Sequence, residues 1–308
     1  MKGLRIIFMG TPEFAVPSLE VLLKNGYNIV AVITAPDRPR GRGQQLATSA
    51  VKDSAVAHNL PVLQPTNLKD PAFVSELKNY KADLQIVVAF RMLPEIVWNM
   101  PTMGTFNLHA SLLPQYRGAA PINWAIINGE KETGVTTFFL KHKIDTGRII
   151  FQEKEPIGPD DTVGDLYQRL MHKGAELVLR TVQGIEKGDF PQTEQDESQI
   201  LTPAPKIFRE DCQISWDQPV SKVYDFIRGL SPYPAAWTDI NGQNLKLFKV
   251  KPLQDNNHPE LKSGDFLTDH KNFLHFKTTD GIIMVKQLQL QGKRKMDIQE
   301  FLRGNKLV

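Results

Sequence analysis

The sequence has little cysteine: Cys212 stands alone among 308 residues. One thiol cannot form an intramolecular disulfide, so a disulfide-stapled secreted scaffold is excluded. Zinc and iron–sulfur centres built on cysteine need several thiolates, and they are excluded for the same reason. No histidine stands close to Cys212 in the sequence, so we expect this residue to pack rather than to act as a nucleophile.

Long apolar runs are also missing. No segment approaches the ~18 residues that a membrane-spanning helix needs. The first apolar stretch, residues 6–9, is too short for a signal-peptide core and ends at Gly10 and Pro12. We therefore expect the protein to begin directly in a strand and to stay in the cytoplasm. Neither sign of charge dominates, since 37 Lys and Arg face 34 Asp and Glu, which argues against a histone-like protein or an acidic tail.

The common nucleotide and hydrolase motifs are absent. The first predicted strand-to-helix turn, residues 10–15, reads Gly-Thr-Pro-Glu-Phe-Ala, which lacks G-x-G-x-x-G. Pro12 also removes an amide that could hold a phosphate. The sequence contains no G-x-x-x-x-G-K-[ST], H-E-x-x-H or G-x-S-x-G. Nicotinamide or flavin binding, P-loop hydrolysis, zinc proteolysis and α/β-hydrolase chemistry therefore lose their usual markers.

What is present in the first part of the chain is an alternation of strands and helices. The chain is 41% hydrophobic and long enough for about two domains. We expect strands at residues 6–9, 28–34, 62–63, 84–89, 105–109, 134–140 and 149–151, and helices at 18–24, 51–56, 73–77, 119–128 and within 161–184. This alternation predicts an α/β fold with a doubly wound, mostly parallel sheet.

The composition changes near residue 188. Residues 188–205 are polar, contain three prolines, and predict a linker. We expect a first domain at 1–188, a linker at 189–206 and a second, smaller domain at 207–308. In the second, short strands at 245–250, 273–276 and 282–285 predict a small β-barrel. Residues 201–308 carry 16 Lys and Arg against 12 Asp and Glu, a surplus that fits a solvated surface or a patch for nucleic acid.

The sequence Asn107-x-His109-x-Ser111 lies where a predicted strand ends, the usual position of a site in an open α/β sheet. Asn107 and His109 share one strand face, and an amide beside an imidazole can donate to a developing oxyanion. Asp145, in a turn between two later strands, could orient the imidazole or move a proton. Together the three residues suit acyl transfer to an amine without a covalent intermediate.

Each of these residues also has a structural interpretation. His109 could be a hydrogen-bonded core histidine, Asn107 could cap a turn, and Asp145 could serve the turn itself. His142 is typical of a solvated neighbour. As a metal pair, His142 and Asp145 lack a third ligand nearby in the sequence.

With these residues the chain resembles the 10-formyltetrahydrofolate-dependent formyltransferases, nearly from end to end. The Asn-x-His-x-Ser-Leu-Leu-Pro signature with a later Asp-x-Gly is specific to that family. The Arg-Gly-Ala-Ala-Pro-Ile extension and the layout of the whole chain resemble its tRNA-acting members. The segments that carry the resemblance are residues 8–15, Pro36-Asp37-Arg38-Pro39, Gly41-Arg42-Gly43, residues 107–122, Glu132-Thr133-Gly134-Val135-Thr136 and Asp145-Thr146-Gly147.

The resemblance implies transfer of a formyl group from 10-formyltetrahydrofolate to the α-amine of methionine on initiator methionyl-tRNA. It implies a Rossmann-like folate-binding domain followed by a β-barrel that resembles an OB fold and binds tRNA. Neither a metal, a membrane nor an obligate protein partner is implied. By the same resemblance the catalytic residues would be Asn107, His109 and Asp145, and the folate site would be lined by Ser111, Leu112, Leu113 and Pro114.

Residues 35–46 form a long segment rich in proline, glycine and arginine. Arg38, Arg40 and Arg42 lie on a backbone that Gly41 and Gly43 would keep mobile. The plain interpretation is a solvated loop. In the family, the corresponding loop enters the acceptor end of the tRNA, and arginine suits that task because its plane contacts phosphates and unpaired bases. Gln44 and Gln45 stand where relatives often carry lysine.

Three competing functions remain at this stage. A formyltransferase acting on an amino-sugar nucleotide or on glycinamide ribonucleotide would carry the same first-domain motif, but the arginine-rich loop and the basic second domain speak against it. A nonenzymatic RNA-binding protein with a relic domain would have lost part of the catalytic set, yet Asn107, His109 and Asp145 are all present. A dehydrogenase lacks its glycine pattern.

Overall fold

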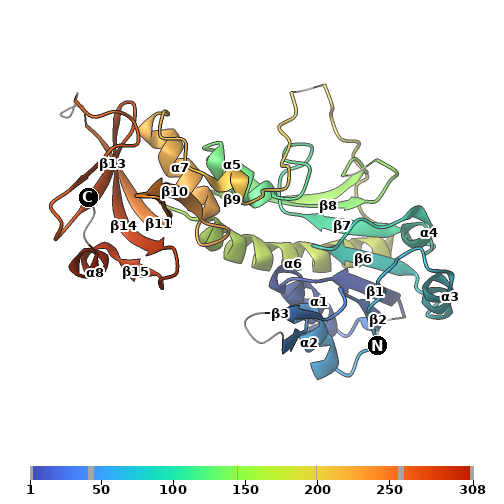
Figure 1. The fold of residues 1–308 in the computed structure, drawn as a ribbon. Helices are drawn as coiled ribbons and strands as arrows, with labels where there is room; N and C mark the ends of the chain where they lie inside the picture. The colour runs from blue at the N-terminus through green and yellow to red at the C-terminus, as the bar shows by residue number, and fades with distance from the viewer. Residues whose placement is uncertain (1–2, 41–44, 144, 199, 256–259, 306–308) are drawn as a thin grey trace. The chain divides into compact units, whose positions relative to one another are not determined.

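The structure is a computed structural model that describes residues 3–40, 45–143, 145–198, 200–255 and 260–305 (Figure 1). The chain divides into two compact units that each combine several segments. Unit 1 comprises Met1–Gly118, Gly134–Glu155 and Tyr167–Pro203, and unit 2 comprises Ala119–Thr133, Pro156–Leu166 and Ala204–Val308. Among the described residues, no helix is both long and apolar enough to cross a membrane.

Unit 1 contains a seven-stranded sheet in the order β5-β2-β1-β6-β7-β8-β9. Strands β5, β2, β1, β6 and β7 run parallel, and β8 pairs with β7 in the antiparallel sense. The predicted α/β class with a doubly wound, mostly parallel sheet is therefore confirmed. The strands are β1 (Arg5–Gly10), β2 (Asn28–Ile33), β5 (Val62–Leu63), β6 (Leu84–Val88), β7 (Thr105–His109), β8 (Glu132–Phe139) and β9 (Ile149–Pro156).

Helices connect these strands where the sequence predicts them, except for the short α4, which the sequence did not indicate. Proline stands in the first turn of α1 and of α3, where a helix has no use for the missing amide. The side chain of Ser49 caps α2 by accepting from Lys52 N. The helices are α1 (Val16–Lys24), α2 (Ala50–Ala57), α3 (Pro71–Asn79), α4 (Glu95–Trp98), α5 (Pro121–Ile127) and α6 (Val163–Lys187), with a 3₁₀ turn η1 (Glu13–Ala15) before α1.

The strand register assigns each site residue to a face of the sheet. Met9, Val87 and Asn107 are neighbours across β1, β6 and β7, so they share one face. The cluster of buried residues on that face includes side chains of α3 and α4. Leu108 points to the other face, where a Cβ on Gly174 of α6 would lie 2.7 Å from it. Asn107 and His109 therefore face away from α6, at the carboxyl end of a central strand.

The arginine-rich segment differs from the expected mobile loop. Its two flanks pair as an antiparallel ribbon of β3 (Arg38–Arg40) and β4 (Gln45–Ala47). Gly41, Arg42, Gly43 and Gln44 lie outside the described residues. Only the tip of the segment, therefore, is left without a described conformation.

Unit 2 is built on an antiparallel sheet that forms half of a barrel, with strands in the order β10-β11-β14-β13-β12 and β15 paired with β14. The strands are β10 (Ala236–Ile240), β11 (Gln243–Gln254), β12 (Phe266–Thr268), β13 (Leu274–Lys277), β14 (Gly281–Leu290) and β15 (Met296–Asp297). The sequence did not indicate the 3₁₀ turn η2 (Glu210–Cys212), α7 (Val220–Leu230) or α8 (Ile298–Gly304). Cys212 lies buried in the core of this unit, and burial is the main cause that raises the pKa of its thiol. Both features fit the expectation that this residue packs.

Unit 2 also contains a helix from the middle of the chain. On α5, Asn123 Nδ2 donates to Gly229 O of α7 at 2.8 Å. A Cβ on Gly229 would lie 2.7 Å from Ile127 Cγ1 and 3.1 Å from Ile127 N, so only glycine allows this approach. The boundaries 1–188, 189–206 and 207–308 stay a prediction, and the structure adds that residues 119–133 and 156–166 pack with the C-terminal strands.

Candidate active site

The site begins at the end of β7. Asn107 is half-buried there, and His109, the last residue of the strand, is only 6% exposed. Both side chains lie on the same face because strand residues alternate with a period of two. The strand order changes direction between β1 and β6, so the neighbouring β7 ends beside the switch point where open α/β sheets bind their ligands.

The ring of His109 is oriented by one hydrogen bond, from Nε2 to Tyr116 O at 2.8 Å. A carbonyl oxygen can only accept, so Nε2 carries the proton and Nδ1 is the atom left for a substrate. No described residue bonds to Nδ1. The neutral ring therefore offers an acceptor at Nδ1, and the protonated ring offers a donor.

Hydrogen bonds within the chain between His109 and α5, and from it to residue 202, hold this stretch in place. Ser111 Oγ donates to Gln115 O at 2.7 Å, and Tyr116 N donates to Thr202 O at 2.7 Å. Tyr116 has φ +60°, a left-handed conformation that directs its carbonyl toward the imidazole. The turn at residues 116–118 thus becomes a fixed support for the ring of His109.

Asp145 contacts the same turn from the other side. Its Oδ2 accepts from Gly118 N at 3.2 Å, and its backbone has φ +54°. Among the described residues, Asp145 and His109 share no direct hydrogen bond. The expected link between them is therefore indirect, because both side chains bond to backbone groups of residues 116–118.

The Asp-x-Gly spacing has a steric cause. A Cβ on Gly147 would lie 1.5 Å from Phe139 O, so no other residue fits where the turn returns to the sheet. Thr146 Oγ1 closes the turn by donating to Lys143 O at 2.9 Å. Glycine is required here so that Asp145 can be presented on a tight turn.

The predicted folate-lining residues, Ser111 to Pro114, are shaped by two side chains that sequence reasoning missed. Thr136 Oγ1 donates to Ser111 O at 2.6 Å and accepts from Leu113 N at 3.2 Å. Gln152 Nε2 donates to Leu113 O and to Thr136 Oγ1, each at 2.9 Å. Thr136 stands opposite His109 in the β7–β8 register. The sequence feature that could have pointed to Thr136 is its place in the segment Glu132–Thr136, which carries part of the family resemblance.

The base of the arginine-rich segment is anchored by Asp37. Lys52 Nζ contacts Asp37 Oδ2 at 2.5 Å, and Gln64 Nε2 donates to Asp37 Oδ1 at 2.8 Å. The hydrogen bond from Lys52, followed by that from Gln64, holds the pKa of Asp37 below its ordinary value. Arg38 follows on β3 and is exposed, while Arg42 lies outside the described residues. Asp37 lies in a segment that carries the family resemblance, but its partners lie 15 and 27 positions away, where no local pattern reveals them.

His142 stays at the surface, as its interpretation as a solvated neighbour predicts. Its side chain is 77% exposed and its Nε2 lies 3.3 Å from Glu95 Oε1. Within the described part of the chain, no three His, Cys, Asp or Glu side chains gather where they could hold a metal.

Fold and site together define an α/β protein with an amide and an imidazole at the end of a central strand and a carboxylate on a nearby turn. The family model described as "Formyl transferase" matches residues 4–182, and "Formyl transferase, C-terminal domain" matches residues 206–306. The chain belongs to the formyl transferase family, as the resemblance predicts.

Curated relatives match along almost the whole chain. The methionyl-tRNA formyltransferase of Bacteroides fragilis is 55% identical over 309 residues, covering 98% of this chain and 95% of the relative. That of Parabacteroides distasonis is 55% identical and covers 100% and 97%. That of Flavobacterium johnsoniae is 50% identical and covers 99% and 97%.

Solved structures share the fold at lower identity. HypX from Aquifex aeolicus, solved with tetrahydrofolic acid, has a TM-score of 0.66 at 21% identity, covering 98% of this chain and 47% of that one. An N-formyltransferase from Helicobacter canadensis, solved with folinic acid and dTDP-3-aminofucose, has a TM-score of 0.68 at 23% identity, covering 92% and 98%. At these identities the likeness supports the fold.

Proposed function

We propose that this chain transfers the formyl group of 10-formyltetrahydrofolate to the α-amino group of methionine on initiator methionyl-tRNA, for translation initiation in the cytoplasm. The observation that carries the proposal is the identity of 50–55% to curated methionyl-tRNA formyltransferases over nearly the full length of both chains. The enzyme needs the folate co-substrate and no metal, and it acts without an obligate protein partner.

The oxyanion donors are Asn107 and His109. The neutral α-amine attacks the formyl carbon, a carbon–nitrogen bond forms, and the carbonyl electron pair moves onto oxygen. Asn107 Nδ2 donates to that oxygen. His109 donates through Nδ1 in its protonated form, because its Nε2 is already committed to Tyr116 O.

Asp145 moves the proton. Its Oδ2 is held by Gly118 N, and Oδ1 has no partner among the described residues. Oδ1 accepts the proton that the attacking amine loses and returns it to the departing folate nitrogen, directly or through water. Collapse of the intermediate then releases tetrahydrofolate and the formylated amine, with atoms and charge balanced.

The substrates are held by different parts of the chain. Ser111, Leu112, Leu113 and Pro114 line the folate site, in the shape that Thr136 and Gln152 impose. Arg38, Arg40 and Arg42 contact the acceptor end of the tRNA. The surplus of positive charge in residues 201–308 binds the phosphate backbone without reading its sequence.

The test is transfer of labelled formyl from 10-formyltetrahydrofolate to three acceptors offered in parallel. Initiator methionyl-tRNA should be formylated, while elongator methionyl-tRNA and an amino-sugar nucleotide should stay unlabelled. Labelling of the sugar nucleotide alone would keep the chemistry at Asn107, His109 and Asp145 and overturn the proposed substrate.

A further inference from the structure

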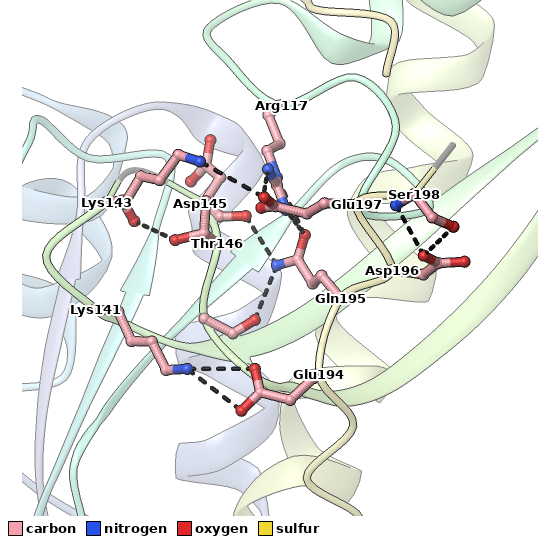
Figure 2. Close-up of polar contacts among 11 residues, drawn as sticks. Arg117, Lys141, Lys143, Asp145, Thr146, Glu194, Gln195, Asp196, Glu197 and Ser198 are labelled. Carbon is pink, nitrogen blue, oxygen red and sulfur yellow. Dashed lines mark hydrogen bonds and ion pairs between the residues drawn. The ribbon is translucent and has the colours of Figure 1, made fainter. Parts of the chain in front are cut away.

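Residues 193–198, which the sequence predicts as part of a linker, lie along the catalytic turns of unit 1. We call this segment the strap (Figure 2). It begins as an antiparallel bridge, in which Thr193 N donates to Ile149 O at 3.0 Å and Ile149 N donates to Thr193 O at 2.8 Å. Shortly after it, Thr202 O accepts from Tyr116 N at 2.7 Å. The polar backbone of this segment is therefore bonded to the site.

Gln195 is the residue of the strap that reaches Asp145. Its Nε2 donates to Asp145 O and to Gly147 O, each at 2.8 Å. Its Oε1 accepts from Arg117 Nε at 3.1 Å and from Arg117 Nη2 at 2.6 Å. A carboxamide has two donors and two acceptor lone pairs, so every hydrogen-bonding position of this side chain is used. Its orientation is fixed as well, since a flipped amide would oppose N–H to N–H and oxygen to oxygen.

These bonds close a ring around the catalytic carboxylate. Gln195 bonds to Asp145 O and to the side chain of Arg117. Gly118, the residue after Arg117, donates its amide to Asp145 Oδ2 at 3.2 Å. The backbone of Asp145 is thus held by Gln195, and its side chain is held by the amide of Gly118 in the turn at residues 116–118. That turn also fixes His109, through Tyr116 O.

Ion pairs flank the amide on both sides. Glu194 pairs with Arg148 at 2.5 Å. Glu194 also pairs with Lys141 at 3.3 Å, and Glu197 pairs with Arg117 at 2.8 Å (Figure 2). The hydrogen bonds from Arg148 and from Arg117 hold the pKa of Glu194 and of Glu197, respectively, below the ordinary value. Both carboxylates are exposed, so these pairs contribute little individually, and the half-buried amide supplies the specific geometry.

We infer that Gln195 is a positioning residue for formyl transfer, which holds the Asp145–Gly147 turn so that the Asp145 carboxylate meets the reacting amine. The inference rests on the proposed function of Asp145. Gln195 touches no reacting atom and acts through the Asp145–Gly147 turn, to which both of its donor bonds run. Its loss should therefore lower kcat and leave the KM of either substrate nearly unchanged.

Two variants separate the donor and acceptor roles of the amide. Gln195→Ala removes all four bonds. Gln195→Glu keeps an acceptor for Arg117 but turns oxygen toward Asp145 O and Gly147 O, so it repels the turn it should hold. Gln192 is an exposed glutamine just before the strap and provides the matched control, as Gln192→Ala.

Single-turnover formyl transfer is measured for the full chain, for these variants and for Asp145→Ala. We expect Gln195→Ala and Gln195→Glu to lose about 10–100-fold in rate, as small misplacements of catalytic groups do, with each KM within about threefold. Gln192→Ala should match the unmodified chain. In the Asp145→Ala background, Gln195→Ala should cost nothing further, because residues that act through each other are not additive.

Either of two results would overturn the inference. The first is a double variant whose loss in rate is the product of the losses from Gln195→Ala and Asp145→Ala. The second is a Gln195→Ala rate within about twofold of that of the unmodified chain. If Gln195→Ala does not fold, Gln195→Glu carries the same comparison. Amide hydrogen exchange at Gly118, which reports the bond to Asp145 Oδ2, gives a readout that needs no activity. Faster exchange in Gln195→Glu supports the inference even if the unmodified chain formylates no tRNA, and unchanged exchange contradicts it.

Discussion

At the scale of single residues, Asn107 and His109 owe their proximity to the alternation of a strand, which the sequence shows directly. Asp145 does not share that predictability. It contacts Gly118, which lies 27 positions earlier in the chain, on the other side of α5. No local pattern in the sequence therefore reveals the bond. Gln195 is further still, 50 positions beyond Asp145 in a polar segment with no periodicity. The candidate residues Asn107, His109 and Asp145 follow from a sequence motif, whereas the residues that hold them in place carry no such signal.

Asn107→Ala tests the oxyanion role. Removing one oxyanion donor costs about 10²–10³-fold in turnover, and a half-buried polar side chain at the end of a strand can be shortened with the fold retained. Steady-state kinetics, with circular dichroism as the folding check, measure the effect. A loss of less than about fivefold would remove Asn107 from the mechanism.

His109 offers a test of which ring nitrogen faces the substrate. An asparagine amide places its nitrogen near the position of Nδ1, and a glutamine amide reaches the position of Nε2. Since Nε2 bonds to Tyr116 O, we expect His109→Asn to retain about tenfold more activity than His109→Gln, the value of one partial oxyanion donor. The reverse order would assign the reactive role to Nε2 instead.

At the scale of elements, the sheet of unit 1 was predictable because its strands are continuous apolar runs separated by helical spacing. The helix α7 was not, although Val220, Val223, Ile227 and Leu230 repeat at helical spacing behind Pro219. The strap has the composition of a linker, yet Thr193 and Gln195 bond to distant segments of the chain. Composition alone therefore cannot separate a linker from a segment that lies along a site.

The β3–β4 ribbon should depend on its anchor at Asp37. Lys52→Met removes the ion pair, and we expect faster hydrogen exchange across residues 45–47 together with a several-fold rise in the KM for tRNA only. Lys69→Met, at an exposed lysine, is the control. An equal rise in the KM for folate would show that the anchor serves the whole site rather than the ribbon.

The sign of the pKa shift predicts how this effect depends on pH. Because the folded pKa of Asp37 is lowered, the pair stabilises the fold above the unfolded pKa of about 3.9 and is lost only as pH falls through the folded pKa. The effect of Lys52→Met on the KM for tRNA should therefore be the same at about pH 6 and about pH 8. If the effect of Lys52→Met on the KM for tRNA changed between about pH 6 and about pH 8, a titratable group other than Asp37 would be responsible for it.

At the scale of the whole molecule, tRNA binding should depend strongly on salt. Phosphate contacts release counterions, each contributing a slope of about −0.7 to −0.9 in a plot of log affinity against log salt. With three arginines and a surplus of four positive charges in residues 201–308, we expect the KM for tRNA to rise at least about tenfold between about 50 and 200 mM salt. The KM for folate serves as the control, and a flat response for tRNA would contradict binding through the phosphate backbone.

The most direct test of the central claim is to identify and count the products of one reaction. Initiator methionyl-tRNA and 10-formyltetrahydrofolate are incubated with the enzyme, and the amino acid released from the tRNA is identified by mass spectrometry beside the tetrahydrofolate formed. The account predicts N-formylmethionine in equal amount to tetrahydrofolate. Tetrahydrofolate formed without formylated methionine, or unmodified methionine with no folate turnover, would contradict it.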